Sequence, residues 1–197
     1  MNPALFLVSF SPLECYYSSY SLGIAWYEWP IMYRGIVYHW RSLPDGYHQL
    51  VYLFGNPILF WLVLATVVVG LFYCDHLLHA AYTETISPAK RRVVQSFVLC
   101  FLGWLANYVP YPILIRRPCY MYHYHPALFF GMLLVGMFFD TISRKFKSKT
   151  AILLSAAILL APIVASYVFF APFSFFLPMT DLEHDRRRWF HSFFKTW

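Results

Sequence analysis

The sequence predicts an all-α integral membrane protein with about four transmembrane helices. Hydrophobic residues make up 60% of the 197 residues and charged residues only 12%, whereas an average soluble domain is about 25% charged. The apolar residues gather in long runs with short basic clusters at their borders. Each helix that crosses about 30 Å of hydrocarbon uses roughly 20 residues, so the chain has room for a single membrane domain.

Residues 1–50 are predicted to form an aromatic-rich segment along the membrane interface. Trp26 and Trp29 stand among tyrosines beside Arg34 and Arg41. Such side chains have apolar bodies and polar tips, so they settle where hydrocarbon meets water. A plain aromatic belt that anchors the following helix is the simpler interpretation of the same residues.

Four apolar runs with polar borders are predicted to be the membrane-spanning helices of a domain over residues 51–177. They cover residues 51–74, 93–115, 126–142 and 150–177. Pro162 is expected to kink the fourth helix, because proline removes a backbone donor and crowds the preceding turn. Residues 178–197 then form a C-terminal tail outside the membrane.

The distribution of lysines indicates which loops face the cytosol. The two sides of the predicted bundle carry nearly equal numbers of Lys and Arg, but the lysines concentrate in the loops 75–92 and 143–149. Positive residues stay on the cytosolic side, so both termini and the loop 116–125 are expected on the opposite side. Lipid headgroups explain the net charge of +6, and no nucleic-acid partner is expected.

Asn56 stands between Gly55 and Pro57 at the entry to the first predicted helix. Proline fits the first helical turn, so Asn56 can act as a simple helix cap. In the alternative interpretation, its amide joins the exposed peptide groups of the helix start in a polar pocket at the membrane surface. The pattern alone does not choose between the two.

Two groups of polar residues have metal-binding side chains but too few of them. Structural zinc sites use four protein ligands, and neither group reaches that number. We therefore expect no metal and no cofactor, and we interpret the first group as the polar end of a helix. The groups are Asp75, His76 and His79, and Cys119, His123 and His125.

The loop between the second and third predicted helices has the composition of a phosphate-binding site. Arg116 and Arg117 precede Pro118 on a constrained turn. A guanidinium donates two hydrogen bonds to one phosphate, and His123 and Tyr124 can add donors. An arginine close to hydrocarbon needs an anionic partner. In an alternative interpretation of equal weight, the two arginines simply extend to the lipid headgroups.

Three blocks of the sequence, taken in order, resemble the C-terminal membrane region of the protein O-mannosyltransferases. The blocks are WYEWPIMYRGIVYHW, QLVYLFGNPILFW and LGWLANYVPYPILIRRPCYMYHYHPAL. The tail RRRWFHSFFKTW is similar to the tryptophan-containing end of that family. The resemblance covers nearly the whole chain from about Ser21 onward, and the order of the blocks makes coincidence improbable.

This family transfers mannose from dolichyl phosphate mannose to Ser or Thr hydroxyls of proteins in the endoplasmic reticulum lumen. The resemblance therefore implies the C-terminal part of a GT-C type glycosyltransferase, multi-pass in the endoplasmic reticulum membrane, with its termini and the loop 116–125 in the lumen. It matches Arg117 with the family arginine and His123 and Tyr124 with its histidine and tyrosine. There Arg117 would stabilise the charge that grows on the departing phosphate. The residues predicted to bind the donor lipid phosphate are Arg117, His123, Tyr124, Asn56 and Arg116.

The resemblance also implies parts that this sequence does not match. Family members carry an Asp-Glu pair in their first lumenal loop, followed by further spans and a β-trefoil domain. The loss of a general base costs about 10² to 10⁴ in rate, so we expect the chain alone to be inactive. Its expected partners are dolichyl phosphate mannose, membrane lipids, and another transferase chain or the missing N-terminal part. In the alternative, it is a non-catalytic membrane protein that binds lipid or pairs with an intact transferase.

Overall fold

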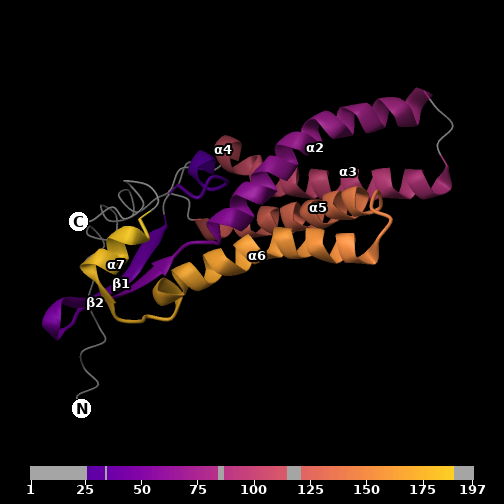
Figure 1. Cartoon of the computed structure of the whole chain (residues 1–197). Helices are drawn as coiled ribbons and strands as arrows, with labels where there is room; N and C mark the ends of the chain where they lie inside the picture. The colour runs from indigo at the N-terminus through magenta and orange to yellow at the C-terminus, as the bar shows by residue number, and fades with distance from the viewer. Residues whose placement is uncertain (1–25, 34, 84–86, 115–120, 189–197) are drawn as a thin grey trace, which may run out of the picture.

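Four long helices and a small sheet at one end of them make up the fold (Figure 1). The computed structural model describes residues 26–33, 35–83, 87–114 and 121–188. The long helices are α2 (Pro57–Thr83), α3 (Pro88–Tyr108), α5 (His125–Ser143) and α6 (Lys149–Ser174). The predicted helical character of the four apolar runs is therefore confirmed. The third and fourth runs agree with α5 and α6 to within a few residues at each end.

The first two predicted helices have different ends in the structure. The first was expected from residue 51, but α2 begins at Pro57 because the preceding apolar residues belong to a strand. The second was expected to reach residue 115, but α3 ends at Tyr108 and a short helix, α4 (Pro110–Leu114), follows. Proline at position 110 cannot donate the next helical hydrogen bond, so the helix breaks there.

Two helical segments of the described residues are long and apolar enough to cross a membrane. These segments are Met121–Ser143, which contains α5, and Lys149–Ser174, which is α6. Pro162 and Pro172 both lie inside α6. That α2 and α3 also cross the membrane stays a prediction.

The all-α prediction is wrong for the segment before α2, which forms a β-hairpin. Strand β1 (Ile36–Ser42) pairs antiparallel with β2 (Tyr47–Leu53), and the tight turn between them, η3 (Pro44–Gly46), ends at a glycine with φ of 74°. Glycine tolerates this left-handed conformation. The strands are rich in β-branched and aromatic residues, which favour a pleated surface.

The C-terminal tail folds back onto this hairpin. Strand β3 (Met179–Thr180) adds to the edge of β2, and α7 (Asp181–Arg186) follows with Thr180 and Glu183 forming a capping box at its start. The side chain of Asp181 contacts His48 on β2. Figure 1 shows α7 beside β1 and β2. The two ends of the described chain therefore meet at one end of the bundle.

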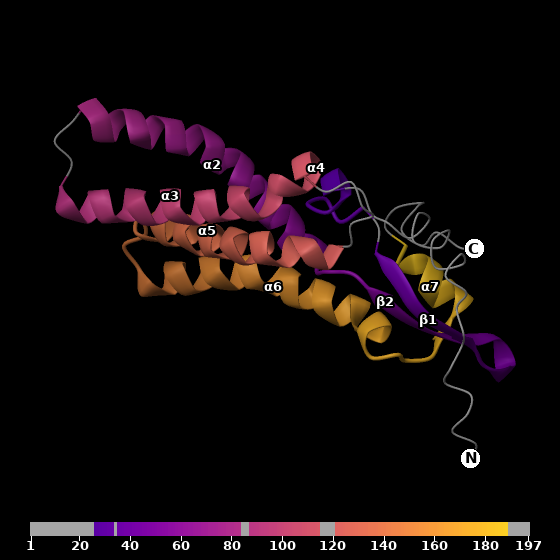
Figure 2. The same cartoon turned by 180° about the vertical axis from the view of Figure 1, so that it is seen from behind.

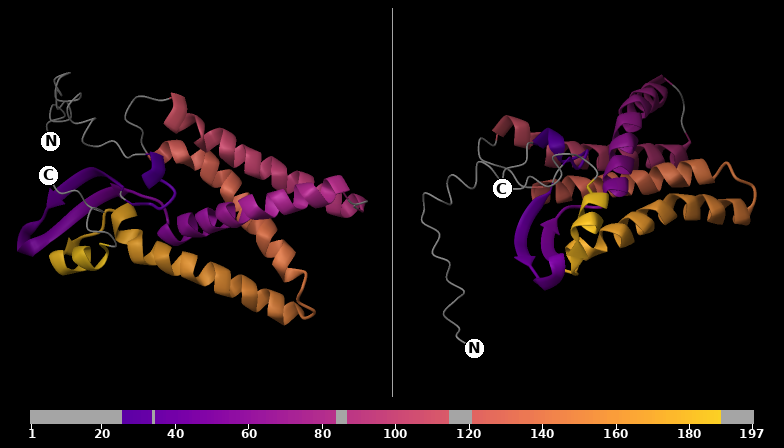
Figure 3. Two further views of the ribbon diagram at one scale, coloured as in Figure 1. Left: turned by 90° about the horizontal axis from the view of Figure 1, so that it is seen from above. Right: turned by 60° about the vertical axis from the view of Figure 1, so that its left-hand side comes forward.

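Helix α5 packs against both α2 and α3, and two glycines allow the close approach (Figure 3). A Cβ atom at Gly131 of α5 would lie 2.3 Å from Cγ1 of Val63 on α2, and one at Gly103 of α3 would lie 2.5 Å from the ring of Phe130 on α5. Small residues at helix contacts are typical of membrane bundles, where tight packing replaces the hydrophobic effect as the source of association.

Candidate functional site

An aromatic cluster lies at the end of the bundle where α2 begins, α3 ends and α5 begins. Figure 2 shows α4 and the segment from residue 26 to residue 33 at this end, the same end as the sheet. The short turn η4 (Met121–Tyr124) leads directly into α5. We define the aromatic cluster as Trp29, Phe60, Trp104, Tyr108, Tyr111, His123 and Tyr124.

Two hydrogen bonds fasten the segment that carries Trp29 to the bundle. The hydroxyl of Tyr108 on α3 donates to the carbonyl of Trp26 at 3.2 Å, and the indole of Trp61 on α2 donates to the carbonyl of Ile31 at 2.7 Å. The segment is thereby tied to two helices at once, and it delivers Trp29 into the space between them.

Trp29 is the centre of the aromatic cluster and is fully buried. Its ring meets Tyr111 edge-on at 5.1 Å between centroids and lies nearly parallel to the imidazole of His123 at 6.3 Å. Within the described residues, its Nε1 has no hydrogen-bond partner. Sequence reasoning placed Trp29 only in an interfacial belt and missed this role.

The imidazole of His123 is held by aromatic rings on three sides. Besides Trp29, it is stacked with Tyr122 at 4.3 Å and lies 5.4 Å from Tyr111 on α4. The side chain is half-buried. Imidazole can donate or accept a hydrogen bond, so His123 brings this ability to the aromatic cluster.

Tyr124 is buried, and its hydroxyl has a partner inside the protein. The indole Nε1 of Trp104 donates to this hydroxyl oxygen at 3.3 Å, and the Tyr124 ring packs against Phe60 and Tyr108. These contacts join α2, α3 and the start of α5. The predicted contact of Tyr124 with a phosphate stays a prediction, and its visible role is to hold the cluster together.

Asn56 caps α2, as one of its two interpretations predicted. Its Oδ1 accepts the backbone N–H of Leu59 at 3.2 Å, which satisfies one of the free donors at the helix start. Its Nδ2 donates to the carbonyl of Ile163 on α6 at 2.7 Å. The amide therefore also links two helices, and a phosphate contact of Asn56 stays a prediction.

The two arginines of the predicted phosphate site, Arg116 and Arg117, lie outside the described residues. In sequence they stand between α4, which ends at Leu114, and η4, which begins at Met121. Both of these flanking elements contribute rings to the aromatic cluster. The structure thus brings His123 and Tyr124 together with Trp29, whereas the side-chain amide of Asn56 is bonded to Leu59 and to Ile163 on α6.

Comparison with protein families gives a match over nearly the whole chain. The family described as "C-terminal four TMM region of protein-O-mannosyltransferase" matches residues 17–193. This range contains every member of the aromatic cluster and the two arginines before it.

Curated proteins of similar sequence include yeast and fish enzymes. Dolichyl-phosphate-mannose–protein mannosyltransferase 1 of Candida albicans is 29% identical over 75% of this chain, and the enzyme of the same name from Saccharomyces cerevisiae is 32% identical over 75%. Protein O-mannosyl-transferase 2 of Danio rerio is 27% identical over 81%. The matches cover 17%, 18% and 22% of these proteins, so the chain spans about a fifth of their length.

A solved structure shares the fold. It is described as the S. cerevisiae protein O-mannosyltransferase Pmt1-Pmt2 complex bound to the sugar donor. The similarity covers 93% of this chain and 27% of that one, with a TM-score of 0.69 and 24% identity.

Proposed function

Because the chain belongs to the protein O-mannosyltransferase family through its C-terminal four-helix membrane region, we propose that it serves the transfer of mannose from dolichyl phosphate mannose to Ser or Thr of proteins. Its contribution is to bind the donor lipid phosphate. The observation that carries this proposal is the aromatic cluster, which fixes His123 of η4 against Tyr111 of α4, the two elements that flank Arg117 in sequence. The substrate class comes from the names of the relatives.

The donor phosphate is bound by Arg117, with Arg116 and His123 as further donors. A guanidinium suits this task because it presents two parallel N–H groups to one phosphate. As the glycosidic bond breaks, negative charge grows on the phosphate, and a fixed positive group stabilises that charge. Tyr124 and Asn56 act mainly by holding η4, α2 and α6 in place, since their polar groups already have partners in the protein.

Activation of the acceptor hydroxyl is assigned to another part of the enzyme. A hydroxyl with a pKa far above neutrality needs a positioned base, and in the family resemblance that base belongs to an Asp-Glu loop that this sequence does not match. We therefore expect the isolated chain to bind donor without transferring mannose.

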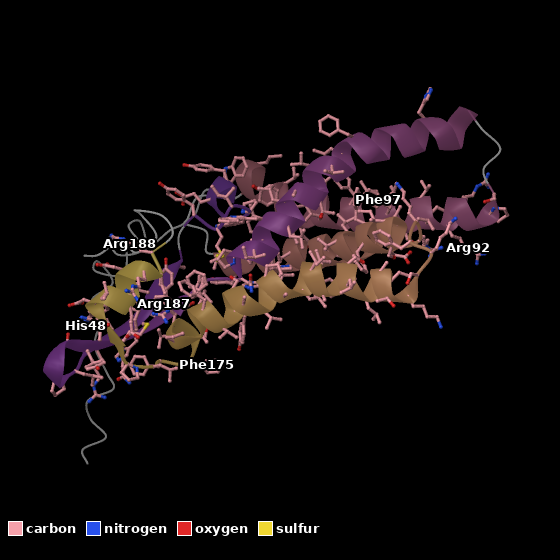
Figure 4. The ribbon with its side chains drawn as sticks, viewed as in Figure 1. His48, Arg92, Phe97, Phe175, Arg187 and Arg188 are labelled. Atoms are coloured by element: carbon pink, nitrogen blue, oxygen red, sulfur yellow. The ribbon has the colours of Figure 1, made fainter. Side chains whose placement is uncertain are left out.

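All four long helices cross the endoplasmic reticulum membrane in this proposal. The sheet, the aromatic cluster and the tail 178–197 face the lumen, and the opposite end faces the cytosol. The basic residues at that opposite end support this orientation. They are Arg91, Arg92, Arg144, Lys145, Lys147 and Lys149. Figure 4 shows Arg92 at the end of the bundle away from His48 and Arg187.

Association with a second transferase chain is also proposed. The solved structure of similar fold is described as a complex of two such proteins, and α6 presents a long apolar surface, on which Leu153 and Ile158 are 70% and 74% exposed. In the alternative function, the chain is a non-catalytic membrane protein that binds lipid or pairs with an intact transferase.

The proposal is tested in a complete enzyme. Residues 17–193 of this chain replace the matching region of S. cerevisiae mannosyltransferase 1, and mannose transfer to a Ser/Thr peptide is measured. Arg117→Ala is expected to lower kcat/KM for dolichyl phosphate mannose by about 10²-fold, the usual effect of removing one group that stabilises developing charge. Arg186→Ala, at an exposed position on α7, is the matched control. Equal rates and donor KM for Arg117→Ala and its parent would overturn the assignment.

A further inference from the structure

A crevice of about 540 Å³ opens between α3 and α5, at the end of the bundle opposite the aromatic cluster. Arg92 lies on its α3 wall, in the first turns of that helix, and Asp140 lies on its α5 wall, in the last turn. Figure 4 shows Arg92 at this end of the bundle. His123 and Tyr124 of the predicted phosphate site lie at the other end, so this crevice is separate from them.

The mouth of the crevice is polar and carries a net positive charge. Arg92 and Ser96 line it from α3, and Asp140 lines it from α5. The Asp140 carboxylate forms a salt bridge with Arg144: it accepts a hydrogen bond from Nε at 2.9 Å and lies 2.8 Å from an Nη of the same guanidinium. The charges of the two arginines and the aspartate leave one positive charge, which matches the single net negative charge of an anionic headgroup such as phosphatidylserine but not phosphatidylcholine, whose net charge is zero.

The part of the crevice that lies toward the middle of α5 is apolar. Met132 and Leu133 line it and are 39% and 42% exposed. They precede Asp140 by about two helical turns, which places them roughly 10 Å further along the helix at 1.5 Å per residue. A ligand that fills the crevice must therefore be charged at one end and hydrocarbon at the other.

Gly136 keeps the crevice open. A Cβ atom at this position would meet none of the described residues within 4 Å, although a Cβ at Gly131 on the same helix would collide with Val63. Gly131 thus serves helix packing, and Gly136 lines the open wall between the polar mouth and the apolar part of the crevice.

We propose that this crevice binds an anionic glycerophospholipid of the cytosolic leaflet. Arg92 and Ser96 donate hydrogen bonds to its phosphate, and an acyl chain lies along Met132 and Leu133. Basic pockets between transmembrane helices on the cytosolic side are suited to such headgroups. A partner helix would cover the two apolar side chains but would not neutralise the net positive charge of the mouth. The inference rests on the membrane crossing of α3 and α5 that the proposed function includes.

The test is lipid retention by the complete 197-residue chain, measured by native mass spectrometry after release from nanodiscs of phosphatidylcholine and phosphatidylserine. The parent chain is expected to retain phosphatidylserine in preference to phosphatidylcholine. Arg92→Gln is expected to weaken that binding about tenfold, as for the loss of a hydrogen bond to a charged group. Arg91→Gln is the control, because it removes the same charge from the neighbouring exposed residue, which does not line the crevice. It is expected to change binding by at most about twofold.

A second pair of variants tests the cavity itself. Gly136→Phe is expected to fill the crevice and abolish the preference, whereas Ala157→Phe adds the same ring to an exposed position of α6 and is expected to leave it unchanged. Equal losses for Arg91→Gln and Arg92→Gln would overturn the proposal in favour of diffuse surface charge. A parent without preference, or a Gly136→Phe variant that keeps it, would overturn it as well. A parent that fails to bind dolichyl phosphate mannose but retains phosphatidylserine through Arg92 supports the crevice and counts against the proposed function alone.

Discussion

Replacing Asn56 separates its two possible roles, because the structure gives each end of its amide a defined partner. Asn56→Ala removes the acceptor that caps the Leu59 N–H and the donor that reaches the Ile163 carbonyl on α6. Asn56→Ser keeps an oxygen for the cap but is too short to reach α6. The difference between the two variants therefore isolates the cap.

The expected magnitudes follow from these contacts. Loss of a helix cap costs about 1 kcal/mol, and loss of a hydrogen bond between membrane helices costs about 0.6 kcal/mol. We expect Asn56→Ala to lower the free energy of unfolding by about 1.5 kcal/mol. Asn56→Ser is expected to lower it by only about 0.6 kcal/mol, the contribution of the hydrogen bond to α6.

The free energy of unfolding is measured by titration of the purified chain with SDS in mixed micelles, followed by far-UV circular dichroism. Binding of dolichyl phosphate mannose is measured on the same samples under conditions where all variants are folded. If Asn56 acts by capping and linking helices, the donor affinity of both variants stays within about twofold of the parent. A twofold change in affinity corresponds to a change in binding free energy of only about 0.5 kcal/mol.

The reasoning is refuted if both variants unfold like the parent while donor affinity falls. That result would assign the Asn56 amide to the polar pocket that its second interpretation described. Equal destabilisation by Ala and Ser would refute the cap alone and leave the link to α6 as the only contribution.

Three further predictions concern helix packing and the attachment of the tail. Gly131→Leu is expected to lower the free energy of unfolding by about 1–3 kcal/mol, because its Cβ would lie 2.3 Å from Val63, and Gly136→Leu is expected to leave it unchanged; equal SDS titration curves for the two variants would contradict this. Burial lowers the pKa of His184 from its ordinary value of 6.5, so the packing of α7 is fully stable above that value and weakens as the pH falls through the lowered folded pKa. Hydrogen exchange of residues 179–188, corrected for the intrinsic effect of pH, measures this weakening, and His184→Phe should abolish it while keeping the ring against Phe173; a parent whose protection stays constant from about pH 8 to about pH 5 would contradict it. Arg187 donates to the carbonyls of Phe169 and Glu183, both at 2.8 Å, and lies 5.2 Å above the Phe169 ring, so Arg187→Lys should speed exchange in α7 by about fivefold, whereas Arg186→Lys, at an exposed position, should not; identical exchange in the two variants would show that Arg187 does not hold α7 to α6.

The helices of this protein could be predicted from sequence, because long apolar runs bordered by charges leave few alternatives. The start of α2 could not be predicted, since the apolar residues of β2 run almost directly into those of the helix. Hydropathy does not distinguish a buried strand from the first turn of a membrane helix. The β-hairpin was missed for a different reason. Its signal, Pro-Asp-Gly between two runs of β-forming residues, is a turn pattern, and it was outweighed by an aromatic and basic composition typical of an interface.

The candidate site could be predicted only in part. His123 and Tyr124 came from the family resemblance, and the structure brings them together in one aromatic cluster. The burial of Trp29 could not be foreseen, because it depends on tertiary contacts. The segment that carries Trp29 docks between α2 and α3, although it lies more than 90 residues before His123 in sequence. The second partner of Asn56 is equally remote, since Ile163 lies 107 residues away in sequence.

Binding of dolichyl phosphate mannose to the purified 197-residue chain tests the central claim most directly. A photoreactive analogue of the donor is added to the chain in nanodiscs, and crosslinked peptides are identified with and without an excess of unlabelled donor. We predict competed crosslinks in the peptide that contains residues 115–124, reduced about tenfold or more by Arg117→Ala and unchanged by Arg186→Ala. Crosslinks that excess donor does not displace, or equal crosslinking by Arg117→Ala and the parent, would contradict the account.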